Sequence, residues 1–289
     1  MTGMSRKPTR GPRRSTGSSS RVRFLGSESD KAHGRWFRVF AEHYDTLAAA
    51  IEPRRTPNAA AALHRLFRRR GPVRRILDVA CGTFSIDLGL VARGYSVVGR
   101  DLSAEMIRAS RRNLREAGLR ANVAVADMRS LRVGGAFDAL LCLGTAFNYL
   151  ASPTDVRRGL RTFRRHLRPG GLLVLDTTNF DPWINNPTNV RAEVDHRLPD
   201  GTRLAIFTMN DQDRTRSLHV ARFITAIQRG RNIDLAFDEA PLRIWTKQTL
   251  SDALRREGFR PIEWWGDLKI GAKYDRQRSP RLVVVAQRA

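Results

Sequence analysis

The stretch DVACGTF, which begins at Asp78, leaves a short apolar segment and enters a helical pattern. Gly82 lets the backbone turn there, and the exposed N–H groups at the start of a helix favour a carboxylate ligand. Nineteen residues after Gly82, Asp101 ends a second apolar segment. An acid in this place accepts hydrogen bonds from both hydroxyls of a ribose. These residues predict a site for a nucleoside ligand that also carries a carboxylate.

A third apolar segment ends in Asp127 and Met128, which could hold an adenine by a carboxylate and by backbone groups. The first motif reads D-x-A-x-G-x-F, with Phe84 at its end, and not the G-x-G-x-x-G of dinucleotide-binding proteins. This difference disfavours a nicotinamide enzyme.

These residues can bind one ligand only if a sheet brings the ends of their strands close together. Five apolar segments carry the motifs: 76–80, 96–99, 123–126, 137–143 and 171–175. Helical patterns lie between the first and second, the second and third, and the fourth and fifth. Such alternation predicts an α/β fold with a doubly wound, mainly parallel sheet, whose ligands bind at the carboxyl ends of the strands. Two more strands at 261–265 and 282–286 make the sheet seven-stranded, and helices at 36–51 and 57–67 precede it.

Residues 181–246 follow a different pattern. Asp200 and Gly201 form a hairpin turn between 190–198 and 203–209, and 233–238 alternates as a half-buried strand does. We therefore predict an antiparallel β insertion that covers the acceptor. The whole chain divides into a disordered basic tail (1–30), N-terminal helices with the cofactor-binding core (31–180), the insertion (181–246) and the C-terminal part of the core (247–289).

The net charge of +24 suggests a nucleic-acid partner. However, only five of the 52 basic residues are lysine, which indicates a general preference for arginine. The tail through Asp30 holds seven basic and two acidic residues, so the rest still carries +19. Nucleic-acid binding therefore remains an alternative to a generally basic surface.

The two cysteines, Cys81 and Cys142, both lie in apolar segments. A buried, reduced pair is typical of cytosolic proteins, so we predict a cytoplasmic location. No apolar run is long enough to cross a membrane, and we assign no metal ligands. Self-association into a homo-oligomer stays open.

The motifs LDVACGT, VVGRDLS, ADM, FDALLCLG and LRPGGLLVLD, in this order, resemble those of class I S-adenosylmethionine-dependent methyltransferases over residues 36–289. Within that superfamily, LCLGTAFNYL followed by RPGGLLVLDTTNFD most resembles glycine/sarcosine N-methyltransferases. The inserted antiparallel sheet also resembles that of deoxyaminosugar N-methyltransferases. The resemblance implies S-adenosyl-L-methionine as the cofactor.

The resemblance also implies roles for single residues. Ala80 and Gly82 would line the methionine moiety, beside Asp78. Asp101 would hold the ribose, and its neighbour Leu102 would also contact the cofactor. Asp127 and Met128 would surround the adenine, and Leu143 would contact the cofactor from the fourth strand. Tyr44 matches a tyrosine that approaches the sulfonium. Arg55, with Arg54 nearly equivalent, matches an arginine that binds the cofactor carboxylate.

Three positions depart from the pattern of the glycine-methylating enzymes. Phe84 replaces a glycine, and we predict that its ring packs against the first helix or the N-terminal segment. Thr178 stands where those enzymes have an arginine for the acceptor carboxylate. Thr145 and Tyr149 replace an asparagine and a histidine. The residues expected to bind the cofactor therefore match the family, whereas those expected to bind the acceptor differ. This difference disfavours glycine as the acceptor.

We therefore predict a methyltransferase that N-methylates a small-molecule amine, with Tyr149 and Asn179 orienting the acceptor and Tyr44 near the methyl group. A free amine needs positioning more than it needs a strong base. An RNA methyltransferase, a small-molecule O-methyltransferase and a weakly active cofactor-binding protein remain as alternatives.

Overall fold

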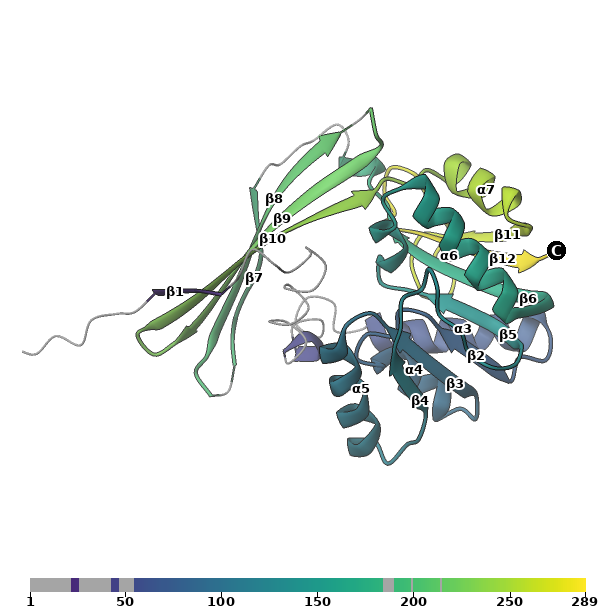
Figure 1. The fold of residues 1–289 in the computed structure, drawn as a ribbon, viewed down its shortest axis with the longest axis horizontal. Helices are drawn as coiled ribbons and strands as arrows, with labels where there is room; N and C mark the ends of the chain where they lie inside the picture. The colour runs from purple at the N-terminus through teal and green to yellow at the C-terminus, as the bar shows by residue number, and fades with distance from the viewer. Residues whose placement is uncertain (1–21, 26–42, 47–54, 184–189, 199, 214) are drawn as a thin grey trace, which may run out of the picture.

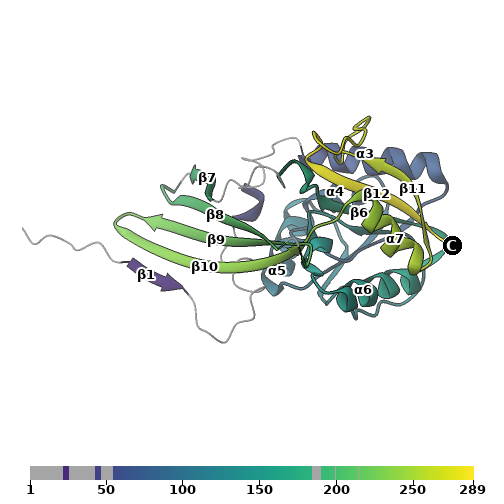
Figure 2. The ribbon, with the colours of Figure 1, turned by 90° about the horizontal axis from the view of Figure 1, so that it is seen from above.

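The structure is a computed structural model that describes residues 22–25, 43–46, 55–183, 190–198, 200–213 and 215–289. It contains an α/β core and a long antiparallel sheet that extends away from that core (Figures 1 and 2).

A seven-stranded sheet forms the core, in the order β11-β12-β6-β5-β2-β3-β4. The strands are β2 (Arg75–Asp78), β3 (Ser96–Asp101), β4 (Asn122–Val125), β5 (Phe137–Cys142), β6 (Leu167–Thr178), β11 (Phe259–Trp265) and β12 (Arg281–Arg288). The pairs from β4 to β6 are parallel, and β12 runs antiparallel to both β6 and β11. The strand order reverses between β2 and β5, so a ligand site is expected where these two strands end. The predicted fold class is thus confirmed.

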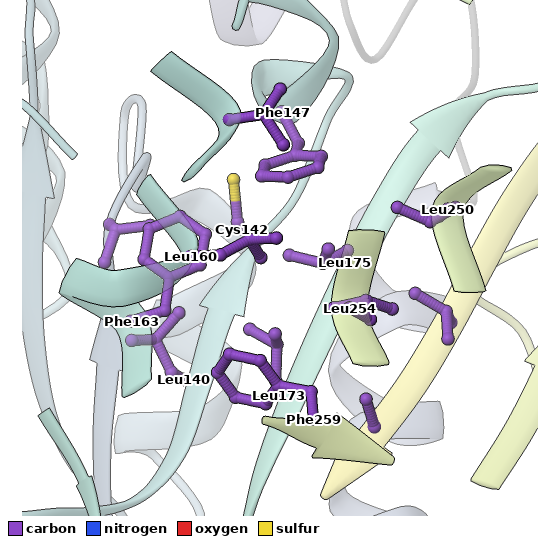
Figure 3. Packing of buried hydrophobic residues seen from close by; sticks show 14 of the residues in the cluster. Leu140, Cys142, Phe147, Leu160, Phe163, Leu173, Leu175, Leu250, Leu254 and Phe259 are labelled. Atoms are coloured by element: carbon purple, nitrogen blue, oxygen red, sulfur yellow. The ribbon is translucent and has the colours of Figure 1, made fainter. Parts of the chain in front are cut away.

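Helices cover both faces of the core sheet. They are α3 (Arg55–Arg70), α4 (Ser85–Val91), α5 (Ala104–Glu116), α6 (Pro153–His166) and α7 (Lys247–Arg256). Side chains of α3, α4 and α5 share one buried cluster with alternate residues of the strands. Side chains of α6 and α7 share the other cluster, in which Phe163, Leu254 and Phe259 surround the side chains of β5 and β6 (Figure 3).

Local sequence sets where these helices begin. The hydroxyl of Ser103 accepts a hydrogen bond from the N–H of Met106, and Ser152 does the same for Asp155. Pro153 follows Ser152 in the first turn of α6, where its missing N–H costs nothing. The predicted helix at 57–67 is confirmed within α3. Of the predicted helix at 36–51, only residues 43–46 lie in the described part of the chain, and 44–46 are helical.

The second sheet has the order β1-β10-β9-β8-β7. Its strands are β1 (Val22–Leu25), β7 (Val190–Arg197), β8 (Arg203–Asp213), β9 (Leu218–Arg229) and β10 (Asn232–Arg243). The predicted hairpin is confirmed, because β7 and β8 pair antiparallel around the turn at Asp200 and Gly201. The strand predicted at 233–238 lies within β10, but its apolar residues do not mark the buried face, since Phe237 is 52% exposed while Ala236 and Asp238 are buried.

Two features of this sheet differ from the sequence-based expectation. β9, the central strand, was not predicted, although it pairs along its whole length with β8 and β10. The prediction of a disordered tail through Asp30 is wrong for β1, which pairs parallel with residues 233–236 of β10. The unpaired backbone groups of an edge strand provide partners that composition does not reveal.

Two short 3₁₀ segments follow strands of the core sheet. η1 (Ala146–Tyr149) follows β5, and η2 (Asp181–Trp183) follows β6. Tyr149 and Phe180 pack against Ala221 and Leu242 of the second sheet. This contact places one end of the second sheet against the segments that follow β5 and β6.

Candidate functional site

The loop after β2 is tied to the end of β3. The carboxylate of Asp78 is buried and accepts a hydrogen bond from the N–H of Ala80 at 2.9 Å. The N–H of Cys81 donates to the carbonyl of Arg100 at 2.9 Å, and the N–H of Gly82 donates to Oδ2 of Asp101 at 2.9 Å. The two motifs predicted to bind one ligand are therefore held side by side.

Asp101 is half-buried, and its second oxygen accepts a hydrogen bond from the N–H of Ser103 at 2.9 Å. Burial raises the pKa of Asp101, while the backbone donors of Ser103 and Gly82 act in the opposite direction. Each carboxylate oxygen has two lone pairs, so each keeps acceptor capacity beyond its backbone donor. A ribose diol needs two such acceptors in a fixed position.

The surroundings of this loop fit S-adenosylmethionine. Gly82 has a φ of 52°, and the space that its missing Cβ would occupy is open within 4 Å. Leu102, next to Asp101, is 53% exposed, which is unusual for a leucine in a structured turn. An adenosine moiety bound to Asp101 would cover this apolar surface. The open backbone, the acidic acceptor and the exposed leucine are what a nucleoside ligand needs in one place.

Phe84 lies in a left-handed conformation, with a φ of 67°, at the start of α4. Its side chain is fully buried, in the cluster that also contains Leu63 and Phe67 of α3. A Cβ atom built on Gly99 would come within 2.8 Å of the ring, so the ring lies directly against β3. The ring is thus buried beside α3, whereas the first predicted helix and the N-terminal segment, against which we expected it to pack, lie mostly outside the described residues.

Asp45 was missed by the sequence analysis. Its carboxylate accepts hydrogen bonds from the hydroxyl of Thr83 at 2.5 Å and from the amide of Asn113 at 2.7 Å. The same amide also donates to the carbonyl of Thr83 at 3.0 Å. Asp45 therefore fastens residues 43–46 to the loop after β2 and to α5. Because Tyr44 is its neighbour, this contact positions Tyr44 close to the loop.

Asp127 is engaged by its neighbour Arg129. The guanidinium of Arg129 donates to both carboxylate oxygens, at 2.6 to 3.0 Å, and also reaches Asp155 at 3.2 Å. Burial opposes ionisation of Asp127, but the hydrogen bonds and charge of Arg129 outweigh it and lower the pKa of that carboxyl. Asp127 is therefore an ionised acceptor whose position is fixed by Arg129. Its neighbour Met128 is half-buried against the core.

Tyr149 lies at the end of η1, half-buried against the second sheet. Burial, followed by the nearby Tyr44 and Asp238, raises its pKa far above the usual range. The phenol is therefore neutral near pH 7, and it can orient a ligand but cannot act as a base. Tyr44, predicted from the sequence to lie near the methyl group, is thus close enough to act on Tyr149, which was predicted to orient the acceptor.

The remaining residues that were predicted to belong to the site are Leu143, Asn179 and Arg55. Leu143 is buried directly after β5, at the edge where the strand order reverses. The amide of Asn179 donates to the carbonyls of Arg276 and Ser279, at 3.0 and 2.8 Å. Both of its N–H groups are therefore used to fix the loop before β12, which gives Asn179 a structural role instead of the predicted role in orienting an acceptor. The side chain of Arg55 lies outside the described residues.

The two buried acids near the loop make stability depend on pH. Burial, with help from Asp101, raises the pKa of Asp78 to about 7, and burial together with Asp78 raises the pKa of Asp87. An acid whose pKa is higher in the folded state retains its proton while the unfolded chain has lost it. Stability therefore falls as the pH rises from about 4 to about 7.

Asp78→Asn keeps the oxygen that accepts from Ala80 and removes this titration. We expect the variant to lose less stability than the wild type between about pH 5 and pH 8. Urea unfolding at both values measures the difference. An equal loss in the two proteins would show that Asp78 is ionised throughout.

Comparisons with known proteins agree with this geometry. Residues 76–171 match a family model described as "Methyltransferase domain". A glycine/sarcosine N-methyltransferase from Parasynechococcus marenigrum is 35% identical over 44% of this chain and 45% of its own length. A dTDP-3-amino-3,4,6-trideoxy-alpha-D-glucopyranose N,N-dimethyltransferase from Streptomyces venezuelae is 29% identical over 62% of this chain and 80% of its own length.

The crystal structure of a S-adenosylmethionine-dependent methyltransferase from Clostridium acetobutylicum superposes with a TM-score of 0.73 at 18% identity. The superposition covers 88% of this chain and 99% of that one. The chain therefore shares the fold of this S-adenosylmethionine-dependent methyltransferase. The match of residues 76–171 to the methyltransferase model and these relatives confirm the resemblance predicted from the motifs. The chain spans about half the length of several curated relatives that it matches.

Proposed function

We propose that the protein is an S-adenosylmethionine-dependent methyltransferase that N-methylates a small-molecule amine. The observation that carries this proposal is the pairing of the Gly82 loop with Asp101 where β2 and β3 end. Relatives that match this chain are named as N-methyltransferases of glycine, sarcosine and a deoxyaminosugar, which supports an amine acceptor.

The cofactor would lie across the carboxyl ends of β2, β3 and β5. Ala80 and Gly82 would contact its methionine part, Asp101 its ribose, and Leu102 with Met128 its adenine. Further contacts would come from Asp127 to the adenine, from Leu143 beside the methyl group, and from Arg55 to the carboxylate. When bound, S-adenosylmethionine supplies a methyl group on a positively charged sulfur.

The protein's part in the reaction is mainly to bring a neutral amine into line with that methyl group. Positioning alone lowers the barrier of such a displacement substantially, since no charge has to be created. Tyr149 stays protonated, so its hydroxyl orients the acceptor as a neutral group. Tyr44 would approach the same place from the segment that Asp45 fastens to the loop.

A small acceptor also agrees with the distribution of positive charge. The exposed arginines of α5 and of α6 lie on opposite faces of the core sheet, because these helices belong to different buried clusters. One nucleic-acid strand cannot use both rows at once. We keep a cytoplasmic location as a prediction. In the part of the chain that the structure describes, no helix is both long and apolar enough to cross a membrane.

Asp101→Ala is expected to weaken binding of S-adenosylmethionine by about 1–3 kcal/mol, because the ribose hydroxyls lose a charged acceptor. Isothermal titration measures the change. Asp252→Ala, which alters a carboxylate on α7 far from the loop, is the matched control and should leave the affinity unchanged. Unaltered affinity in Asp101→Ala would remove Asp101 from the binding site.

The acceptor class is tested by transfer of a labelled methyl group to amines, hydroxylated metabolites without an amine, and RNA. We expect label only in the amines. Label only in RNA, or only on a hydroxyl oxygen, would contradict the proposal.

A further inference from the structure

Four polar side chains meet where β5, β6 and β12 lie side by side. Arg281 of β12 donates from Nε to Oδ1 of Asp176 at 2.7 Å. Its Nη1 donates to the hydroxyl oxygen of Thr145 at 2.9 Å and to that of Thr178 at 3.2 Å. The two hydroxyl oxygens are 2.8 Å apart. One guanidinium therefore binds two hydroxyls that belong to different strand ends.

The charge of this guanidinium is already compensated. The side chain of Arg281 is 11% exposed and that of Asp176 is fully buried. The second oxygen of Asp176 accepts from the N–H of Gly144 at 3.0 Å, so the acid is also fixed to the end of β5. A buried ion pair with these hydrogen bonds leaves no net positive charge to attract a free carboxylate. What the pair does provide is a rigid support for Thr145 and Thr178.

The two threonine hydroxyls keep hydrogen-bonding capacity that is not used by the residues that the structure describes. Thr145 and Thr178 each carry one O–H, and one of these is used in the bond between them. Both oxygens accept from Nη1 of Arg281. One O–H and one lone pair therefore remain for a ligand. Both side chains are half-buried and reach the surface of the site.

The backbone conformation of Thr145 independently indicates that this residue belongs to a ligand site. Its φ of 77° lies in the left-handed region, which is a true outlier for a β-branched residue. The residue is held there by the bond from its N–H to the carbonyl of Asp176 at 3.1 Å. Asn148 fixes the other partner, since its side-chain oxygen accepts from the N–H of Thr178 at 3.2 Å. Strain of this kind concentrates at sites that position a ligand.

The location of the pair points to the acceptor. Thr145 lies two residues after Leu143, where the methyl group of the cofactor is expected, and it directly precedes η1, which ends at Tyr149. Thr178 ends β6 just before the segment that leads into the insertion. The hydroxyl pair thus lies where the chain runs from the expected methyl site toward Tyr149 and Phe180, which contact the second sheet.

We propose that Thr145 and Thr178, oriented by Arg281, recognise a hydroxyl group next to the amine of the acceptor. The inference rests on the proposed function and narrows its substrate to hydroxylated amines such as amino sugars. A hydroxyl both donates and accepts, and so matches the O–H and lone pair that the two threonines offer. The carboxylate of an amino acid only accepts, and it meets no uncompensated cation here.

The test compares two amines that differ by a single hydroxyl, 2-aminocyclohexanol and cyclohexylamine, with glycine as the carboxylate-bearing alternative. The wild type is expected to methylate 2-aminocyclohexanol with a kcat/KM about 5–10 times that for cyclohexylamine, as one hydrogen bond provides. Thr178→Val should bring this ratio close to one, chiefly through KM, with the affinity for S-adenosylmethionine unchanged. Thr178→Ser retains a hydroxyl and should restore the preference.

Thr145→Ala provides a second variant should the valine disturb folding, and it should reduce the same ratio. An unchanged ratio in both folded variants, or a wild type that prefers glycine, would overturn the inference while leaving N-methylation intact. A wild type that binds no S-adenosylmethionine or methylates no amine overturns the proposed function, and the inference with it.

Discussion

Replacement of Phe84 by glycine is expected to lower the free energy of unfolding by about 2–4 kcal/mol. Loss of a fully buried phenylalanine costs about 3–5 kcal/mol, and glycine recovers about 1 kcal/mol because it adopts the left-handed conformation without strain. Denaturant unfolding measures the change. Phe84→Ala should be less stable than Phe84→Gly, because alanine loses the ring and keeps the strained φ.

Phe237→Ala is the control for the Phe84 variants, since Phe237 is 52% exposed and its removal should have little effect on stability. Binding of S-adenosylmethionine to Phe84→Gly is expected to remain detectable at low temperature. A Phe84→Gly protein with wild-type stability and much tighter cofactor binding would show instead that the ring occupies the pocket.

Removal of the carboxylate in Asp176→Ala is expected to destabilise the protein by about 3–5 kcal/mol, because the guanidinium of Arg281 would be left buried and unpaired. The N–H of Gly144 would also lose its side-chain acceptor, whereas the N–H of Thr145 would keep the backbone carbonyl of residue 176. Thermal and denaturant unfolding measure this loss.

The double variant Asp176→Ala with Arg281→Met, compared with the two single variants, measures the interaction between the two side chains. Because methionine removes the unpaired charge, the double variant should be more stable than Asp176→Ala alone. A double variant whose loss equals the sum of the two single losses would show that the two side chains do not interact.

The core sheet could be predicted because each of its strands carries its own apolar segment and turn signal. The strand β9 could not, since residues 218–229 contain arginine, threonine and glutamine among the apolar residues, and only pairing with β8 and β10 on both sides stabilises it. The strand β1 lies in a tail whose composition indicates disorder. Its partner is the edge of β10, more than two hundred residues later.

The cofactor side of the site was predictable for a similar reason. Asp78, Gly82 and Asp101 lie at strand ends that the motifs mark. In the structure Asp78 accepts a hydrogen bond from Ala80, and Asp101 accepts one from Gly82. The roles of Asp45 and Arg281 were not predictable, because their partners are distant in sequence and an isolated arginine among 47 carries no signal. Asn179 shows the opposite error, since its place in a motif did not reveal the two carbonyls that its amide binds.

The central claim is that the loop after β2 and the carboxylate of Asp101 together bind S-adenosylmethionine. Isothermal titration of the wild type and of Asp101→Ala with S-adenosylmethionine, S-adenosylhomocysteine and NAD⁺ tests it most directly. We predict saturable binding of both adenosyl compounds to the wild type, weaker binding of both to the variant, and no binding of NAD⁺. Saturable binding of NAD⁺ that S-adenosylmethionine does not displace, or no binding of either adenosyl compound, would contradict the account.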